Sequence, residues 1–217
     1  MTKVNQSRDS GTTQRSLTKQ RLVETARELF YQNGYEATGI KQILAKAGVN
    51  SGSLYYFFPT KEDLLLAVLE RYKELLWPMV LDPVFDRTGD PIEQVFGVLE
   101  GYRKMLLATY CRQGCPIGNL ALEMSEKSDA VRKAVAENFE GWRVAIRQCL
   151  MDAGDRLPAD VDRDRLATLI LTTMEGGVMQ ARAHRNLEPY EASVAMLRDY
   201  VDRLLLHKSG GVSECAG

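Results

Sequence analysis

The stretch from Thr38 to Lys61 gathers small hydroxyl side chains, two adjacent tyrosines and a lysine, and it reads TGIKQILAKAGVNSGSLYYFFPTK. The hydroxyls of Tyr55 and Tyr56 can donate to phosphates, and their rings can contact thymine methyl groups. Asn50 is a good helix cap, which leaves the first amides of the next helix free to meet a phosphate. Lys61 can meet a phosphate but reads no sequence. This chemistry is that of binding a DNA duplex.

Two short helices, expected at 40–46 and 51–57, must position these side chains. Gly48 stands between them, where the turn needs a positive φ, and Pro59 ends the second helix. Within that helix Leu54 and Phe58 point to the core and the tyrosines outward, although packing of either tyrosine against the neighbouring helices is the alternative. A helix-turn-helix of this kind places its second helix in the major groove. The predicted DNA contacts are Thr38, Asn50, Ser51, Gly52, Ser53, Tyr55, Tyr56 and Lys61.

The rest of the chain shows apolar residues at three- and four-residue spacing and no sustained alternation, so we expect an all-α fold. A first helix should span about 18–33 and stop at Gly34. Thr60 and Asp63 should cap a fourth helix that ends near Trp77. A proline-rich connection follows. Five more helices are expected at 91–110, 119–126, 128–152, 161–184 and 189–206, which makes nine.

These elements suggest four segments: a disordered arm at 1–16, a DNA-binding domain at 17–63, a ligand-binding and dimerisation domain at 64–207, and a disordered tail at 208–217. Residues 1–61 carry nine Lys and Arg against four Asp and Glu, a balance of +5, whereas the remainder carries 19 against 25, or −6. A basic head on an acidic body fits one face meeting phosphate.

Composition excludes several classes of protein. Hydrophobic residues make up 45% and charged residues 26%, as in ordinary globular chains. No apolar run reaches the roughly 20 residues that span a bilayer, so we expect no membrane association. The first sixteen residues are polar and lack the apolar central region of a secretory signal peptide. We therefore expect the protein to be cytoplasmic.

The segment RELFYQNGYEATGIKQILAKAGVNSGSLYYFFPTKEDLL resembles the DNA-binding domain of the TetR family of bacterial regulators over about residues 18–66. The matching positions are Phe30, Gly34, Tyr35, Thr38, Ala47, Gly48, Val49, Leu54, Tyr55, Phe58 and Lys61. The chain departs from the family at Gly39, Ser51 and Phe57, where polar or charged residues are common. The resemblance implies a nine-helix homodimeric repressor that a ligand releases from a double-stranded operator.

A sensing domain needs an apolar cavity for its inducer. We expect residues from several helices to line it, although aromatic and methionine side chains at helical spacing also form ordinary cores. The predicted ligand-binding residues are Trp77, Tyr102, Met105, Tyr110, Cys115, Phe139, Trp142 and Met174.

Dimerisation should use the last two long helices as half of a four-helix bundle. Glycines in a helix lower its stability by roughly 1 kcal/mol each, so a glycine pair there suggests a close helix crossing. Packing within one subunit is the alternative for about half of the residues. The predicted interface residues are Gly176, Gly177, Val194, Leu197, Tyr200, Val201 and Leu204.

The four cysteines, Cys111, Cys115, Cys149 and Cys215, are expected to be reduced thiols. Cys115 precedes a helix, which could lower its pKa and make it an oxidant or electrophile sensor, or it could be an ordinary small residue in a turn. Zinc binding is disfavoured because the two histidines are distant, and we expect no metal or cofactor. A cysteine enzyme would need a nearby base and is also disfavoured. A helical interaction module without DNA binding remains an alternative.

Overall fold

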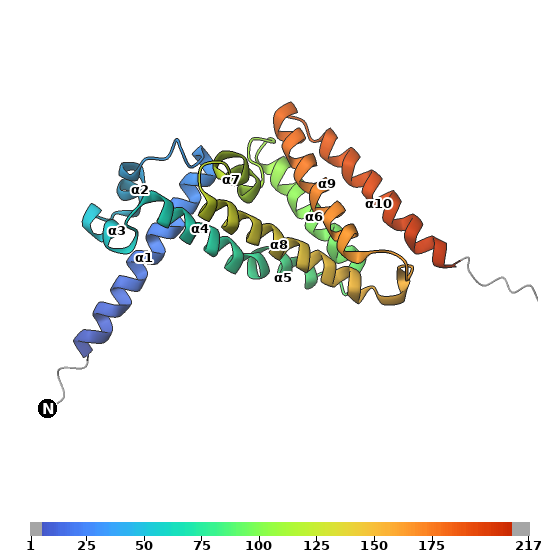
Figure 1. The fold of residues 1–217 in the computed structure, drawn as a ribbon, viewed down its shortest axis with the longest axis horizontal. Coiled ribbons are helices and arrows are strands. Elements are labelled where there is room, and N and C mark those ends of the chain that lie inside the picture. The colour runs from blue at the N-terminus through green and yellow to red at the C-terminus, as the bar shows by residue number, and fades with distance from the viewer. Residues whose placement is uncertain (1–5, 210–217) are drawn as a thin grey trace, which may run out of the picture. The chain divides into compact units, whose positions relative to one another are not determined.

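The computed structural model describes residues 6–209, which are helical throughout their regular structure and contain no strand (Figure 1). All nine predicted helices are found in this range. The α-helices are α1 (Gln6–Asn33), α2 (Ile40–Ala47), α3 (Ser51–Phe57), α4 (Lys61–Leu75), α5 (Asp82–Phe85), α6 (Pro91–Ala108), α7 (Pro116–Met124), α8 (Asp129–Asp152), α9 (Arg163–His184) and α10 (Glu188–Ser209). None of the helices in these residues is both long and apolar enough to span a bilayer.

The first helix corrects one prediction. The helix begins at Gln6, so the prediction that residues 6–16 are disordered is wrong. Residues 1–5 lie outside the described range. This early stretch is polar and has no apolar stripe, which is why periodicity did not detect it. Extending a helix that already exists requires no new nucleation, so a stretch without an apolar stripe can continue α1 toward its N-terminus. Likewise α10 runs to Ser209, and the remaining tail lies outside the described residues.

The proline-rich connection is also helical. A π-helical segment, η1 (Leu76–Leu81), continues from α4, and the short α5 follows directly. Pro78 has no N–H to donate, which favours a wider turn over a regular α-helix. Pro83 lies in the first turn of α5, where a missing N–H has no effect. Between α8 and α9 the chain forms a single 3₁₀ turn, η2 (Gly154–Arg156).

The described chain divides into two compact units. The first runs to Lys73 and includes Asn119–Ala136, so it extends past the predicted domain end at residue 63. The reason is packing: α4 buries Leu64, Leu65, Val68 and Leu69 completely. In addition, the carboxylate of Glu123 accepts hydrogen bonds from the amides of Tyr35, at 2.9 Å, and Glu36, at 2.7 Å.

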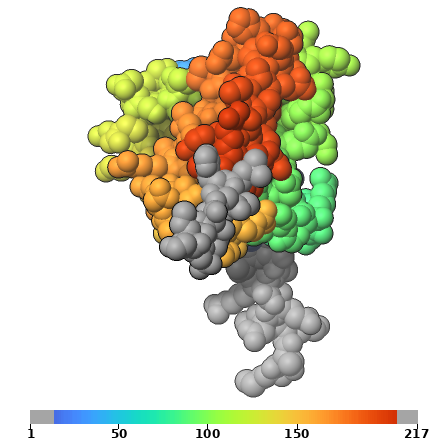
Figure 2. Space-filling view, turned by 90° about the vertical axis from the view of Figure 1, so that its right-hand side faces the viewer, coloured from blue at the N-terminus to red at the C-terminus, as the bar shows by residue number. Residues whose placement is uncertain are grey.

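The second unit consists of Glu74–Gly118 and the chain from Glu137 onward. Its core joins η1, α6, the later part of α8, α9 and α10. Helices α9 and α10 pack along each other, and α10 lies between α9 and α6 on the face that Figure 2 shows. Tyr190 of α10 is buried, and its hydroxyl donates to the carbonyl of Leu99 at 2.7 Å. This contact ties α10 to α6.

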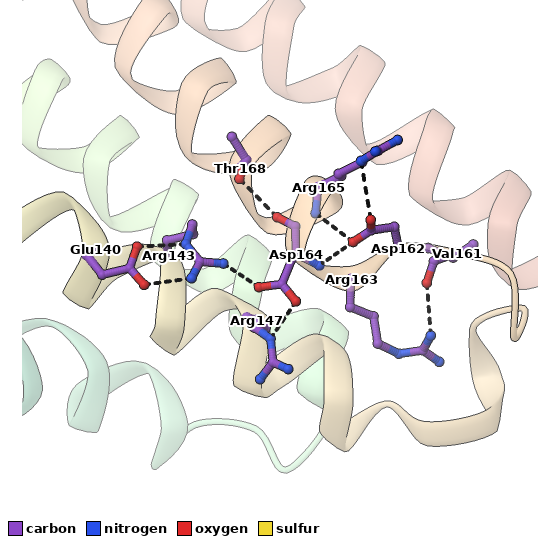
Figure 3. A network of polar contacts seen from close by, with 9 residues as sticks. All are labelled: Glu140, Arg143, Arg147, Val161, Asp162, Arg163, Asp164, Arg165 and Thr168. Atoms are coloured by element: carbon purple, nitrogen blue, oxygen red, sulfur yellow. Dashed lines mark hydrogen bonds and ion pairs between the residues drawn. The ribbon is translucent and has the colours of Figure 1, made fainter.

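Charged residues fix the start of α9 (Figure 3). Asp162 caps the helix by accepting from the amides of Asp164 and Arg165, each at 3.0 Å. Arg143 and Arg147 of α8 both donate to the carboxylate of Asp164 in the first turn of α9. Carboxylates at this end of a helix also interact favourably with its dipole. The pairs are exposed, so they define the helix position more than they stabilise the fold.

Candidate nucleic-acid interface

The turn between α2 and α3 has the predicted geometry. Gly48 adopts a left-handed conformation with φ of 61°, and its amide donates to the carbonyl of Leu44. Asn50 has an extended backbone, and its side-chain oxygen accepts from the amide of Ser53 at 2.8 Å. The predicted turn glycine and helix cap are therefore confirmed. Together they set the direction in which α3 leaves the turn.

The two faces of α3 also lie as predicted. Leu54 and Phe58 are buried, at 0% and 3% exposure, and hold α3 against the core of the first unit. Tyr55 is 51% exposed and Tyr56 is 70% exposed, so packing inward is wrong for both. Ser51 and Gly52 are exposed and Ser53 is half-buried on the same short helix. The outer face of α3 is therefore a polar surface that carries two aromatic rings.

The predicted DNA contact of Thr38 is wrong. Its side chain is completely buried, and its hydroxyl lies 2.7 Å from the carbonyl of Gly34 and 3.2 Å from that of Leu29. A buried hydroxyl that satisfies backbone carbonyls cannot reach a duplex. Thr38 therefore closes the loop between α1 and α2, and we remove it from the predicted DNA contacts.

Lys61 has an internal role that the sequence did not reveal. Its ammonium donates to the carbonyl of Tyr35 at 2.6 Å and lies 4.0 Å from the centre of the Tyr35 ring. Burial lowers the pKa of Lys61, although the nearby carboxylates of Glu36 and Glu123 raise it. The side chain is half-buried. Lys61 thus joins α4 to the loop before α2, and any phosphate contact would be an additional role.

A groove of about 460 Å³ lies between α1 and α3. Gln14, Arg15 and Thr18 line it from α1, and the α3 side includes Ser53 and Tyr56. Gln14 and Arg15 were not predicted as contacts because they fall in the segment 1–16 that was expected to be disordered, and Thr18 was predicted to be helical but not to contact DNA. A basic residue one turn before a predicted amphipathic helix was the available signal.

The predicted ligand-binding residues of the second unit do not form one group. Trp77 is 48% exposed and Tyr110 is 81% exposed, so neither faces an interior cavity, and we withdraw both. The physical reason for Tyr110 is that it occupies the tight turn after α6, with φ of 50°. Met174 is fully buried, whereas Met105 and Phe139 are half-buried, and all three pack in the core.

Three of the predicted residues do come together. The rings of Tyr102 and Trp142 meet edge to face with centres 5.8 Å apart. The Tyr102 hydroxyl donates to the sulfur of Cys115 at 3.6 Å, and the amide of Gly118 donates to the same sulfur at 3.5 Å. These contacts join α6, α8 and the start of α7 within the second unit.

Glu175 of α9 belongs to the same cluster and was missed by the sequence analysis. Its Oε1 atom is buried and has no hydrogen-bond partner among the described residues, and a side chain at Gly118 would meet its Oε2 atom at 2.6 Å. Burial raises the pKa of Glu175, and burial with the neighbouring Cys115 and Glu175 raises that of Tyr102. A lone acidic residue in an apolar helix face was its only signal in the sequence.

The prediction that Cys115 has a lowered pKa is wrong. Its side chain is 3% exposed, and burial together with the Glu175 carboxylate raises its pKa well above the usual value. Cys111 and Cys149 are buried as well, whereas Cys215 lies outside the described residues. Thiolates are the reactive form of cysteine, so Cys115 in this conformation is a poor nucleophile. Across the described residues no group of three or more His, Cys, Asp or Glu side chains could hold a metal ion.

The predicted dimer residues divide into two sets. Gly177, Leu197 and Val201 are buried inside one subunit, and Gly177 allows the ring of Tyr190 to approach. The close crossing that the glycines suggested is therefore between α9 and α10 of the same chain. Val194 and Leu204 are half-buried against the same core. Tyr200 is 46% exposed, and open space lies beside Gly176.

Comparisons with known proteins agree with this architecture. The family model for bacterial regulatory proteins of the tetR family matches residues 22–68, and the model for the LmrA/YxaF-like transcriptional regulator C-terminal domain matches residues 91–195. The transcriptional regulator AcuR of Cereibacter sphaeroides is 30% identical over 190 residues, covering 86% of each chain. The transcriptional repressor DhaR of a Mycobacterium species is 28% identical over 179 residues, covering 82% of this chain and 88% of that one.

Solved structures give the same result. A regulatory protein TetR from Rhodobacter sphaeroides matches with a TM-score of 0.73 at 28% identity, covering 83% of this chain and 97% of that one. A TetR transcriptional regulator from Chloroflexus aurantiacus matches with a TM-score of 0.74 at 29% identity, covering 88% of this chain and 96% of that one. With its capped helix-turn-helix and its helical second unit, this chain belongs to the TetR family of DNA-binding transcriptional regulators.

Proposed function

We propose that the protein is a dimeric repressor that binds a palindromic operator through α3 and is released by a small-molecule inducer. The observation that carries this proposal is the exposed pair Tyr55 and Tyr56 on a helix whose start is fixed by Asn50 and whose opposite face is buried. A rigidly held helix with an exposed polar face is what major-groove reading requires. The repressor DhaR, a relative of this chain, supports the sign of regulation.

The proposed dimer surface is the outer face of α9 and α10. Leu169 and Met179 of α9 and Met196 and Tyr200 of α10 are each 45–67% exposed, and Gly176 lies on the same side of α9 as the first two. A face this apolar on two long helices suits pairing with its two-fold mate. We therefore keep Gly176 and Tyr200 from the predicted interface and add Leu169, Met179 and Met196.

The proposed inducer site is the cluster of Tyr102, Cys115, Trp142 and Glu175. Support comes from the buried Oε1 atom of Glu175, which has no hydrogen-bond partner in the described part of the chain. An unsatisfied buried carboxylate oxygen destabilises the protein until a donor reaches it. An inducer with an N–H or O–H group next to an aromatic ring would satisfy this oxygen and stack on the aromatic pair. Binding that favours one arrangement of the dimer would lower operator affinity by that preference alone.

The experiment that tests the function is selection of genomic fragments on the purified, immobilised protein, followed by sequencing. We expect the retained fragments to share an inverted repeat with half-sites about 10 base pairs apart or a multiple of this spacing. Fragments that share no repeat, or equal retention of random DNA, would contradict the proposal. Loss of all retention would favour an interaction module without DNA binding.

A further inference from the structure

The N-terminal part of α1 extends beyond the family's DNA-binding domain. The family model begins at residue 22, whereas α1 begins at Gln6. From Gln14 to Arg21 every side chain is exposed or half-buried, so this part of the helix has little packing to stabilise it. Figure 1 shows it running past α2 and α3 within the first unit. A helical segment without a core of its own suggests a binding role.

The charge on the stretch from Gln14 to Val23 has one sign. Arg15, Lys19 and Arg21 lie between Gln14 and Val23, and no acidic residue does. Arg21 reaches the carbonyl of Ala47, and Lys19 lies 5.9 Å from the centre of the Phe58 ring. Arg15 is exposed and has no carboxylate partner among the described side chains. Among the described cations between Gln14 and Val23, Arg15 is therefore the one without such a contact, and it is available to a ligand.

Arg15 also faces the recognition helix. It lines the groove of about 460 Å³ together with Gln14 and Thr18, opposite Ser53 and the exposed Tyr56 of α3. The groove thus offers a guanidinium and an amide on one side and hydroxyl groups on the other. Guanidinium, amide and hydroxyl groups are the usual partners of phosphate oxygens in protein–DNA complexes.

We propose that this groove holds a backbone phosphate of the operator, with Arg15 as the main contact and Gln14 as the second donor. The inference rests on the proposed DNA binding by α3 and adds a contact surface that the matched family domain does not contain. A phosphate held between α1 and α3 would fix the position of Tyr56 along the duplex. The contact would add affinity without reading sequence.

The test compares the full-length protein with Arg15→Ala and with the control Arg165→Ala. Arg165 is an exposed arginine of α9 in the second unit, so its removal makes the same change in net charge. Fluorescence anisotropy measures binding to a selected operator duplex and to a scrambled duplex at several salt concentrations. Alanine favours helix, so α1 should persist in Arg15→Ala, and circular dichroism checks this.

We expect Arg15→Ala to weaken binding to both duplexes roughly five- to tenfold near 0.1 M salt, and the slope of log affinity against log salt to fall by about 0.9. Arg165→Ala should match the parent. Unchanged affinity and slope in Arg15→Ala would overturn the inference, and so would a loss confined to the operator, which indicates base reading instead. If the parent itself bound no duplex, the proposed function would fail.

Discussion

At the residue scale, the helix-turn-helix was largely predictable because local chemistry decides it. The conformation of Gly48, the cap at Asn50 and the burial of Leu54 depend on neighbours within a few residues. Thr38 was assigned wrongly, and the internal contact of Lys61 was not predicted. Their partners, the carbonyls of Gly34 and Tyr35, come from a loop whose path the sequence does not give. Glu175 was missed for the same reason, since its neighbours come from other helices.

The exposed tyrosines lead to the first prediction. Tyr56→Ala should weaken operator binding roughly tenfold, about 1.4 kcal/mol, because it removes both a ring and a hydroxyl from the proposed contact. Tyr110→Ala is the control, since Tyr110 is equally a surface tyrosine but lies in the second unit. Gel-shift titration measures the effect. Equal binding by the two variants would remove Tyr56 from the interface.

Thr38 gives a prediction of the opposite kind. Thr38→Val keeps the side-chain shape but removes the hydroxyl that donates a hydrogen bond to the carbonyl of Gly34. We expect the free energy of unfolding to fall by about 1 kcal/mol, with the salt dependence of DNA binding unchanged. Chemical denaturation and anisotropy measure the two quantities. A flatter salt dependence with unaltered stability would return Thr38 to the DNA contacts.

At the element scale, the helices that carry an apolar stripe or a clear cap were found within a few residues. The cap formed by Thr60 and Asp63 is confirmed, with the hydroxyl of Thr60 accepting from the amide of Asp63 at 3.0 Å. Elements without such signals were not predictable. The sequence of the early turns of α1 has no apolar stripe, and η1 forms around a proline that usually ends a helix. In both cases the adjoining helix, rather than the local sequence pattern, determines the structure.

Asp90 tests the importance of a cap at this scale. It accepts from the amides of Ile92 and Glu93 at the start of α6 and pairs with Arg156 at 2.9 Å. Asp90→Ala should lower the free energy of unfolding by about 1 kcal/mol at neutral pH. Asp90→Asn should lower the free energy of unfolding by less, because asparagine also caps helices. Thermal and urea denaturation measure both losses.

The pH dependence follows from the ion pair. The Arg156 guanidinium and the two backbone amides hold the pKa of Asp90 below its usual value. A carboxyl whose pKa is lower in the folded state stabilises the fold above its unfolded pKa, about 4, and loses that effect as the pH falls through the folded value. The difference in free energy of unfolding between the parent and Asp90→Asn should therefore shrink as the pH falls below about 4. A difference that grows on acidification would contradict this assignment.

At the scale of the whole molecule, the fold class and the division into a DNA-binding and a second helical unit were predictable, whereas the interface was not. Hydrophobic stripes on α9 and α10 do not reveal which stripe faces the subunit's own core. The structure assigns Leu197 and Val201 to that core and leaves Met196 and Tyr200 outside. Only the packing of complete helices distinguishes the two sides.

The proposed dimer surface gives the prediction at this scale. Met196→Glu should convert the dimer to a monomer, because burying two carboxylates near the two-fold axis without partners is strongly unfavourable. Operator affinity should fall at least tenfold as a result. Met79→Glu is the matched control, since Met79 is 61% exposed on η1. Light scattering after size-exclusion chromatography measures the mass. A dimeric Met196→Glu would place the interface elsewhere.

The most direct test of the central claim is a salt-dependent anisotropy titration of the purified protein with its selected operator duplex. We expect saturation at two chains per inverted repeat and an affinity that falls steeply as salt rises, since phosphate contacts release counterions. Affinity that does not change with salt, or no binding to any duplex at low ionic strength, would contradict the claim that α3 reads DNA.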